Sequence, residues 1–152
     1  MPQAVGLSSS DLAPRRVGLT RALALATALA ALALLTVAAR LTPAAAGAGT
    51  HMQLGLPNCG WMMTMGKPCP TCGMTTAFAH ASHGQFGKAI AVQPMGAVLS
   101  LATAAAFWIG LYVAVTGSRI GEVCGNLARP RVLWVLTGAG AAAWAYKLYT
   151  WP

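Results

Sequence analysis

Residues 22–39, ALALATALAALALLTVAA, contain no charged side chain and decide the fold class. Alanine and leucine are among the best helix formers, so this stretch predicts a continuous helix. Together with its flanks it reaches the roughly 20 residues that a helix needs to cross the hydrocarbon core of a bilayer. We therefore predict a first membrane span over about residues 17–41.

A cleaved secretory signal peptide is the alternative interpretation of the same stretch. Arg15 and Arg16 would form its basic start, and Ala44–Ala46 its small-residue cleavage site. However, the apolar run is longer than that of a typical signal peptide, and Arg40 separates it from the cleavage site. An uncleaved span is therefore favoured, and cleavage would leave the topology of the remaining chain unchanged.

Two further apolar stretches follow in the second half of the chain. One extends over residues 95–116, directly after Pro94, which is compatible with the first turn of a helix. The other extends over residues 132–151 and contains Lys147, whose long side chain can reach the membrane surface from a helix end. The sequence therefore predicts an all-α membrane protein with three transmembrane helices.

The composition agrees with this fold class and excludes several functions. Hydrophobic residues make up 57% of the 152 residues and charged residues 8%, whereas about a quarter of a typical soluble domain is charged. The chain has only two carboxylate side chains, Asp11 and Glu122, which excludes paired-carboxylate catalysis and carboxylate-rich metal sites. We predict that the polar residues 1–14 form a disordered tail and that residues 15–152 form a single helical membrane domain.

The ten lysines and arginines indicate how the chain is oriented. They stand at the edges of the apolar runs, so we expect contacts with the lipid bilayer and none with nucleic acid. Because cytoplasmic loops are enriched in these residues, the N-terminus is predicted to be cytoplasmic and residues 42–88 exoplasmic. This orientation places six of them inside (Arg15, Arg16, Arg21, Arg119, Arg129, Arg131) and four outside (Arg40, Lys67, Lys88, Lys147).

The loop and short helix over residues 54–88 contain most of the reactive side chains, including three of the four cysteines. If Pro70 opens a helix with Cys69 as its N-cap, Gly84 ends it after about 15 residues, too few to span a bilayer. At about 100° per residue, a polar stripe of roughly 80° then collects Cys69, Cys72, Thr76, His80 and His83. We therefore predict a short amphipathic helix that carries the CPTC motif.

Three chemistries fit this stripe. Cys69 and Cys72 could be catalytic in thiol–disulfide redox, because a helix N-terminus lowers the pKa of a thiol, with Cys59 as a third, resolving thiol. Alternatively, Cys59, Cys69 and Cys72 could bind Zn²⁺ or Cu⁺ together with His80 or His83. In the third interpretation, Cys59 pairs with one of the other two cysteines only to hold the loop together.

The string GKPCPTCGMTTAF at Gly66–Phe78 resembles the signature of the DUF2752 family of small bacterial membrane proteins. Leu56–Cys59, Gly84 and Gln93–Pro94 resemble it as well, and the resemblance covers roughly residues 54–116. It implies a small multi-pass helical protein, here of the bacterial inner membrane, and assigns no reaction.

The chain departs from the family pattern at two positions. Thr76 stands where the family usually has arginine, and Gln93 where it usually has asparagine. The missing arginine removes a cation close to Cys72 and weakens the case for a strongly activated thiol there.

The sequence thus leaves two functional hypotheses open. The first is a membrane protein with an exoplasmic Cys/His site for thiol redox or a soft metal. The second is a non-catalytic accessory or scaffold protein that packs on a larger membrane complex, with cysteines that only staple a loop. Whether the protein is an enzyme stays undecided, although serine, lysine and carboxylate mechanisms have no support in the sequence.

Overall fold

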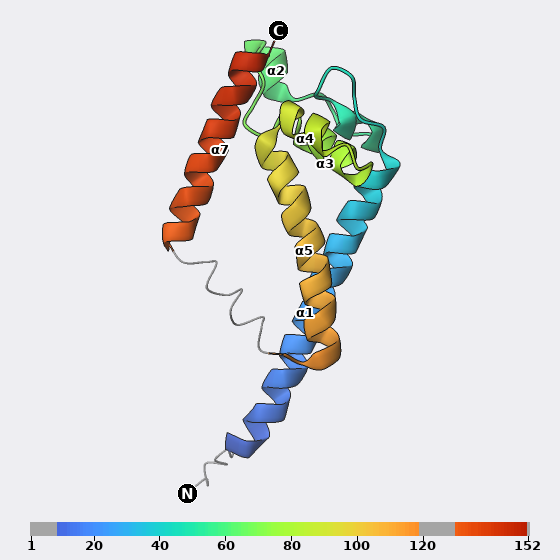
Figure 1. Cartoon of the computed structure of the whole chain (residues 1–152), viewed down its shortest axis with the longest axis vertical. Coiled ribbons are helices and arrows are strands. Elements are labelled where there is room, and N and C mark those ends of the chain that lie inside the picture. Colours follow the sequence, from blue (N-terminus) through green and yellow to red (C-terminus); the bar gives the residue numbers. More distant parts are fainter. Residues whose placement is uncertain (1–8, 119–129, 152) are drawn as a thin grey trace, which may run out of the picture.

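All the secondary structure in the described part of the chain is helical, as the sequence predicts. The computed structural model describes residues 9–118 and 130–151, with side chains from residue 17 onward. Within these two ranges, six α-helices and one 3-10 helix follow one another (Figure 1). They are α1 (Ser9–Arg40), η1 (Thr50–Leu54), α2 (Gly60–Met65), α3 (Met74–Ser82), α4 (Phe86–Val92), α5 (Pro94–Thr116) and α7 (Pro130–Thr150).

Two helices are long and apolar enough to cross a membrane: Val17–Arg40 within α1, and α5. In the most apolar 18-residue stretch of each helix, only 17% is buried inside the protein. Most of the apolar surface of the two helices therefore has no protein cover. The third predicted span, residues 132–151, coincides with α7, which has sufficient length with 21 residues. However, α7 is less apolar than the two candidate spans, because glycines, tyrosines and Lys147 interrupt its apolar residues.

Helix α1 begins at Ser9, so residues 9–14, which we predicted as part of a disordered tail, are helical. The prediction ended the helix where the apolar run ends, but a helix can continue beyond a membrane boundary into water. The rest of the predicted tail, residues 1–8, lies outside the described residues, as does the fourth cysteine, Cys124.

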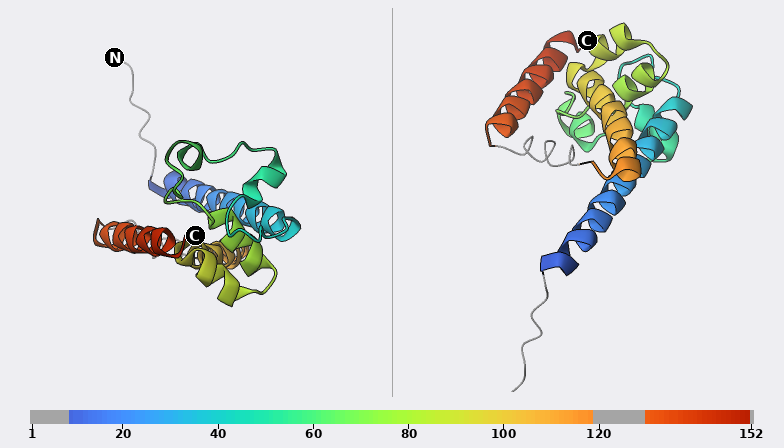
Figure 2. Two further views of the ribbon diagram at one scale, coloured as in Figure 1. Left: turned by 90° about the horizontal axis from the view of Figure 1, so that it is seen from above. Right: turned by 60° about the horizontal axis from the view of Figure 1, so that its bottom comes forward.

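Helices α1 and α5 lie side by side and antiparallel (Figures 1 and 2). Their close approach depends on Gly110, where a Cβ atom would lie 2.8 Å from the Ala24 carbonyl oxygen and 3.2 Å from the Ala28 Cβ. At the far end of the pair, the Arg21 guanidinium donates hydrogen bonds to the carbonyls of Ala114 (2.9 Å) and Val115 (2.6 Å). Arginine therefore caps the last turn of α5, where carbonyls lack partners within the helix.

A Gly110→Ala substitution is expected to destabilise the protein by about 1–3 kcal/mol, because the new methyl group meets backbone that cannot rotate away. The matched control is Gly138→Ala in α7, where a Cβ atom would have no neighbour within 4 Å. Thermal unfolding of the two purified variants in detergent measures the difference. Equal loss of stability in both variants would contradict the packing at Gly110.

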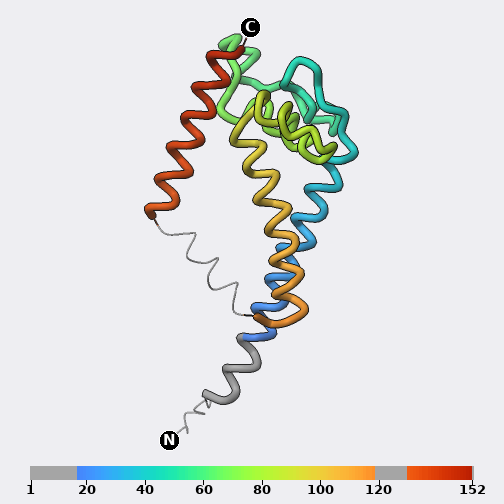
Figure 3. Tube along the Cα trace, viewed as in Figure 1, coloured from blue at the N-terminus to red at the C-terminus, as the bar shows by residue number. Residues whose placement is uncertain are grey.

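The short helices form a cap at one end of the long pair, where α1 ends and α5 begins (Figures 1 and 3). Helix α3 is the centre of this cap, since Ala77 and Ala79 are fully buried. Gly96, in the first turns of α5, lets α3 approach closely, because a Cβ atom there would lie 2.8 Å from the Ala77 Cβ. The C-terminal end of α7 reaches the same cap, so three distant segments of the chain meet there (Figure 2).

Candidate functional site

The CPTC motif forms a turn that precedes α3, not the first turn of the helix. The Cys72 amide donates to the Cys69 carbonyl over 3.0 Å, and Pro70 occupies the second position of this four-residue turn. The next residue, Gly73, has φ of 87° and separates the turn from α3, which begins at Met74. The predicted helix start at Pro70 is therefore wrong. The φ angle that proline imposes suits the second position of a turn as well as the start of a helix.

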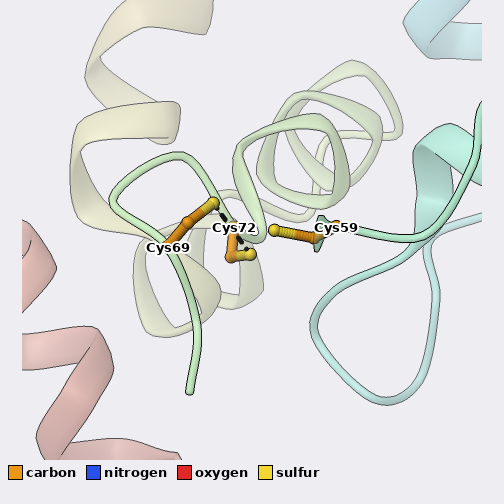
Figure 4. A group of neighbouring side chains, drawn as sticks. All are labelled: Cys59, Cys69 and Cys72. Atoms are coloured by element: carbon orange, nitrogen blue, oxygen red, sulfur yellow. Dashed lines mark hydrogen bonds between the residues drawn. The ribbon is translucent and has the colours of Figure 1, made fainter. Parts of the chain in front are cut away.

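This turn brings two thiols into contact. The Sγ atoms of Cys69 and Cys72 lie 3.1 Å apart and form a hydrogen bond (Figure 4). Cys69 is half-buried, whereas the Cys72 side chain is buried at 7% exposure. The more accessible thiol of the pair is therefore Cys69.

A third sulfur comes from the N-cap residue of α2. This six-residue helix begins after Cys59 and ends at Gly66, whose φ of 66° reverses the chain toward the CPTC turn. As a result, the sulfur atoms of Cys59, Cys69 and Cys72 all lie within 4.8 Å of one another (Figure 4). We call these three residues the cysteine cluster.

Two side chains from distant helices fix the backbone on either side of Cys69. The Trp144 indole N–H of α7 donates to the Pro68 carbonyl over 3.1 Å. The Gln93 amide, at the N-cap of α5 and 1% exposed, donates to the Pro70 carbonyl, also over 3.1 Å. Prolines have no amide hydrogen to anchor the turn, so these carbonyls are the groups through which the fold can hold it.

Lys147 of α7 anchors the far side of the turn. Its ammonium donates to the Gly47 carbonyl (3.2 Å) and the Val92 carbonyl (3.1 Å), and its side chain is 5% exposed. A Cβ atom on Gly73 would lie 3.3 Å from the ammonium nitrogen, so the cation lies next to the turn. The sequence suggested that this lysine extends to the membrane surface. Instead it turns inward, because the carbonyls of Gly47 and of Val92, at the end of α4, accept its hydrogen bonds.

The two thiols of the turn have opposite acidities. Burial raises the pKa of Cys69, but hydrogen bonds from the Thr71 hydroxyl and from the Cys72 and Cys59 thiols outweigh it and lower that pKa to about 7. Burial, together with the hydrogen bond to Cys69, raises the pKa of Cys72 to about 12. Above about pH 7 the predominant form of the pair is therefore a Cys69 thiolate that accepts a hydrogen bond from a Cys72 thiol.

Removal of the Thr71 hydroxyl is expected to make Cys69 less acidic. The Thr71 Oγ1 lies 3.2 Å from the Cys69 Sγ, and a hydrogen bond to an anion is worth roughly one pKa unit. The rate of Cys69 alkylation should have its midpoint near pH 7 in the unmodified protein, and about one unit higher in Thr71→Val. Thr71→Ser keeps the hydroxyl and serves as control. An unchanged midpoint in Thr71→Val would contradict this role.

The two predicted histidines do not join the cysteine cluster. His80 lies in the last turn of α3 and bonds through Nδ1 to the Gln85 side-chain oxygen (2.9 Å), while the His83 Nδ1 bonds to the Ala79 carbonyl (2.7 Å). Among the described residues, the group of side chains that could share a metal contains the three cysteines alone. The predicted stripe assumed one continuous helix, and the break at Gly73 separates the cysteines from it.

Thr76, which was placed in the same stripe, is fully buried and structural. Its hydroxyl bonds to that of Thr50 over 2.8 Å, and Thr50 in turn accepts the Ala44 amide over 3.0 Å. This chain of hydrogen bonds attaches α3 to the loop that follows α1.

The residues that support the turn were not recognised as such in the sequence. Gln93, Trp144 and Lys147 are separated from it by 20 residues or more along the chain, and no local pattern connects them. The sequence does offer one indication of their role: each is a polar or amphipathic side chain at the edge of an apolar run. Such side chains need a hydrogen-bond partner when buried.

Comparison with known protein families finds a match that includes the CPTC turn. Residues 59–108 match the model of a family described as a protein of unknown function, DUF2752. The match begins at Cys59 and includes the cysteine cluster, α3, α4 and the first part of α5. No curated protein and no solved structure matches the chain. The resemblance predicted from the sequence is confirmed over these residues, which make up about a third of the chain.

Proposed function

We propose that this protein is a membrane thiol–disulfide protein in which Cys69 and Cys72 cycle between dithiol and disulfide. The observation that carries the proposal is the 3.1 Å contact between their sulfur atoms, in a turn fixed on both sides by Trp144 and Gln93. A disulfide needs sulfur atoms about 2.05 Å apart, so only a small side-chain movement is required.

The acidity difference assigns the roles in this cycle. The Cys69 thiolate attacks a disulfide of a partner and forms a mixed disulfide, which releases one partner thiolate. The Cys72 thiol then loses its proton and attacks the Cys69 sulfur, which forms the internal disulfide and releases the second partner thiolate. Two electrons move from the cysteine pair to the partner. Cys59, the third sulfur of the cluster, is placed to attack the mixed disulfide in competition with Cys72.

We also propose that α7 is a third membrane span. Its 21 residues correspond to about 32 Å, which matches the hydrocarbon thickness of a bilayer. Its first half exposes large apolar side chains, Trp134 at 78% and Val135 at 70%, that lipid would cover. The close packing of α1 on α5 favours an uncleaved first span over a signal peptide.

The proposed orientation places the cysteine cluster on the exoplasmic side of a bacterial inner membrane. The cap of short helices lies at one end of the long helices, and Arg21 caps α5 at the other end. Arg15, Arg16 and Arg21 belong to the part of α1 at that second end. The sequence has three more arginines between the end of α5 and the second residue of α7, which supports a cytoplasmic N-terminus. Disulfides form and persist in the oxidising compartment outside this membrane.

A soft-metal site is the second candidate function, favoured by the three sulfur atoms within 4.8 Å of one another. Three thiolates bound to one ion at about 2.3 Å lie about 3.8 Å apart in tetrahedral geometry, so the cluster needs little rearrangement. Thiolates suit Cu⁺ and Zn²⁺, and a set of three sulfurs without histidine suits Cu⁺ better, because structural Zn²⁺ takes a fourth protein ligand.

A Cys59→Ser substitution separates the two candidates. The redox proposal expects that the Cys69–Cys72 disulfide still forms in this variant, because its two sulfurs are unchanged. A metal site would instead lose affinity by about a hundredfold, because one of three ligands is gone. Mass spectrometry of alkylated thiols and metal analysis of the purified variant measure the two outcomes. Loss of the disulfide in Cys59→Ser would contradict the assignment of Cys69 and Cys72 as the redox pair.

A further inference from the structure

A large cavity connects the cysteine cluster with the membrane-facing side of the two candidate spans. Its volume is about 1120 Å³, slightly above the usual range for small-molecule sites. Lining residues on α1 extend from Ala30 to Ala38, which corresponds to about 12 Å along the helix. Leu99 and Thr103 of α5 line it as well.

The walls of this cavity are open to lipid. Leu34 and Val37, both on its α1 side, are 52% and 44% exposed. They belong to a helix that is long and apolar enough to span a membrane, so the hydrocarbon of a bilayer would surround them. A ligand can therefore enter sideways from the membrane interior.

The chemistry of the lining restricts the ligand to an apolar, uncharged molecule. Among the described residues, no lysine, arginine, aspartate or glutamate lines the cavity, so it has no cation to neutralise a phosphate headgroup. The ionisable groups that the described residues contribute to its lining are His51 and the three thiols of the cysteine cluster. The thiols lie at one end, where they would meet the head of a ligand whose tail follows α1.

We propose that this cavity binds a membrane-dissolved isoprenoid quinone, which accepts two electrons from the Cys69–Cys72 dithiol. The inference rests on the proposed thiol–disulfide function. The quinone reoxidises the Cys69–Cys72 pair after a partner dithiol has reduced it, by the reverse of the exchange steps given above. A quinone is uncharged, carries an apolar tail and oxidises thiols, and the cavity offers an apolar channel that ends at two thiols in contact.

The Cys69 thiolate adds to a ring carbon of the quinone and forms a carbon–sulfur bond. The Cys72 thiol then attacks the Cys69 sulfur, so that the sulfur–sulfur bond forms, the carbon–sulfur bond breaks and its electron pair stays on the ring. The Cys72 proton and one proton from water end on the two ring oxygens. The products are one disulfide and one hydroquinone.

The test uses the full chain, reduced and reconstituted in lipid nanodiscs without oxygen. One sample receives a decyl-substituted benzoquinone, and a second receives the water-soluble thiol oxidant diamide. Quinone absorbance and mass spectrometry of alkylated cysteines follow the reaction. We expect one hydroquinone per chain and loss of free Cys69 and Cys72 with the quinone, and the same disulfide with diamide.

Bulky substitutions in the wall connect this reaction with the cavity. Leu34→Trp fills the α1 side and is expected to slow quinone-driven oxidation about tenfold or more, which corresponds to about 1.4 kcal/mol, with diamide oxidation unchanged. The matched control is Leu32→Trp, because Leu32 is 44% exposed on the same helix but does not line the cavity. If Leu34→Trp fails to fold, Leu99→Trp with Val98→Trp as its control repeats the comparison on α5.

The outcomes separate this inference from the proposed function. Oxidation by diamide but not by the quinone would overturn the quinone site and leave the redox pair intact. Oxidation by neither would overturn both. Quinone oxidation that is equally fast in the wall variants and their controls would show that the cavity is not the route, and would also overturn the inference.

Discussion

Replacement of Cys72 by serine, in a chain that also carries Cys59→Ser so that Cys59 cannot take its place, is expected to abolish the oxidised form of the pair and to leave Cys69 open to alkylation with and without reductant. Serine cannot form a disulfide, but its hydroxyl can still donate a hydrogen bond to the Cys69 thiolate across the 3.1 Å contact. Cys69 should therefore stay acidic while redox cycling falls to background. Mass spectrometry of alkylated protein from membranes measures both effects.

The same variant tests the accessory hypothesis, in which the cysteines only staple a loop. A staple contributes about 2–4 kcal/mol to stability, so its loss would lower the amount of protein in the membrane. The redox proposal expects normal insertion of this double variant together with loss of function. Depletion of the variant from the membrane, with function retained in proportion to the remaining protein, would contradict the redox proposal.

A Gly73→Ala substitution is expected to disrupt the cysteine cluster. The φ of 87° at Gly73 is unfavourable for alanine, and the new Cβ atom would lie 2.7 Å from the Gly47 carbonyl oxygen, which Lys147 also binds. Left-handed strain and this backbone clash together amount to about 2–4 kcal/mol. The turn must move to relieve them, so Cys72 should lose its contact with Cys69. Thermal unfolding and the rate of diamide-driven disulfide formation measure the two consequences.

The matched control for this change is Gly84→Ala, just after α3. Gly84 has φ of 73°, but a Cβ atom there would have no neighbour within 4 Å. Gly84→Ala therefore introduces the left-handed strain, about 1–2 kcal/mol, without the clash, and should leave the rate of disulfide formation unchanged. Equal rates of disulfide formation in the two variants would contradict the packing of Gly73 against Gly47.

The long helices could be predicted from the sequence because each contains one continuous run of apolar residues. The apolar run over residues 95–116 exceeds the length of a bilayer span, and the run over residues 22–39 reaches it together with its flanks. Each falls within a helix of the structure. The meeting of Cys59, Cys69 and Cys72 was also predictable in outline, since all three lie in one loop.

The local geometry of the site was not predictable from periodicity. Proline fits both a turn and a helix start, and only the backbone conformation of Gly73 decides that the CPTC motif is a turn. The alignment of His80 and His83 with the cysteines depended on that choice. The supports from Trp144 and Lys147 depend on tertiary contacts across 76 and 100 residues of sequence, which no local pattern contains.

The central claim, that Cys69 and Cys72 form a redox pair, is tested most directly by thiol alkylation in intact native membranes. Samples are labelled without treatment, after reductant and after a chelator, and each of the three clustered cysteines is read by mass spectrometry. The account predicts that label on Cys69 and Cys72 rises together after reductant and does not change with the chelator. A rise after the chelator alone, or full labelling of both residues in every sample, would contradict it.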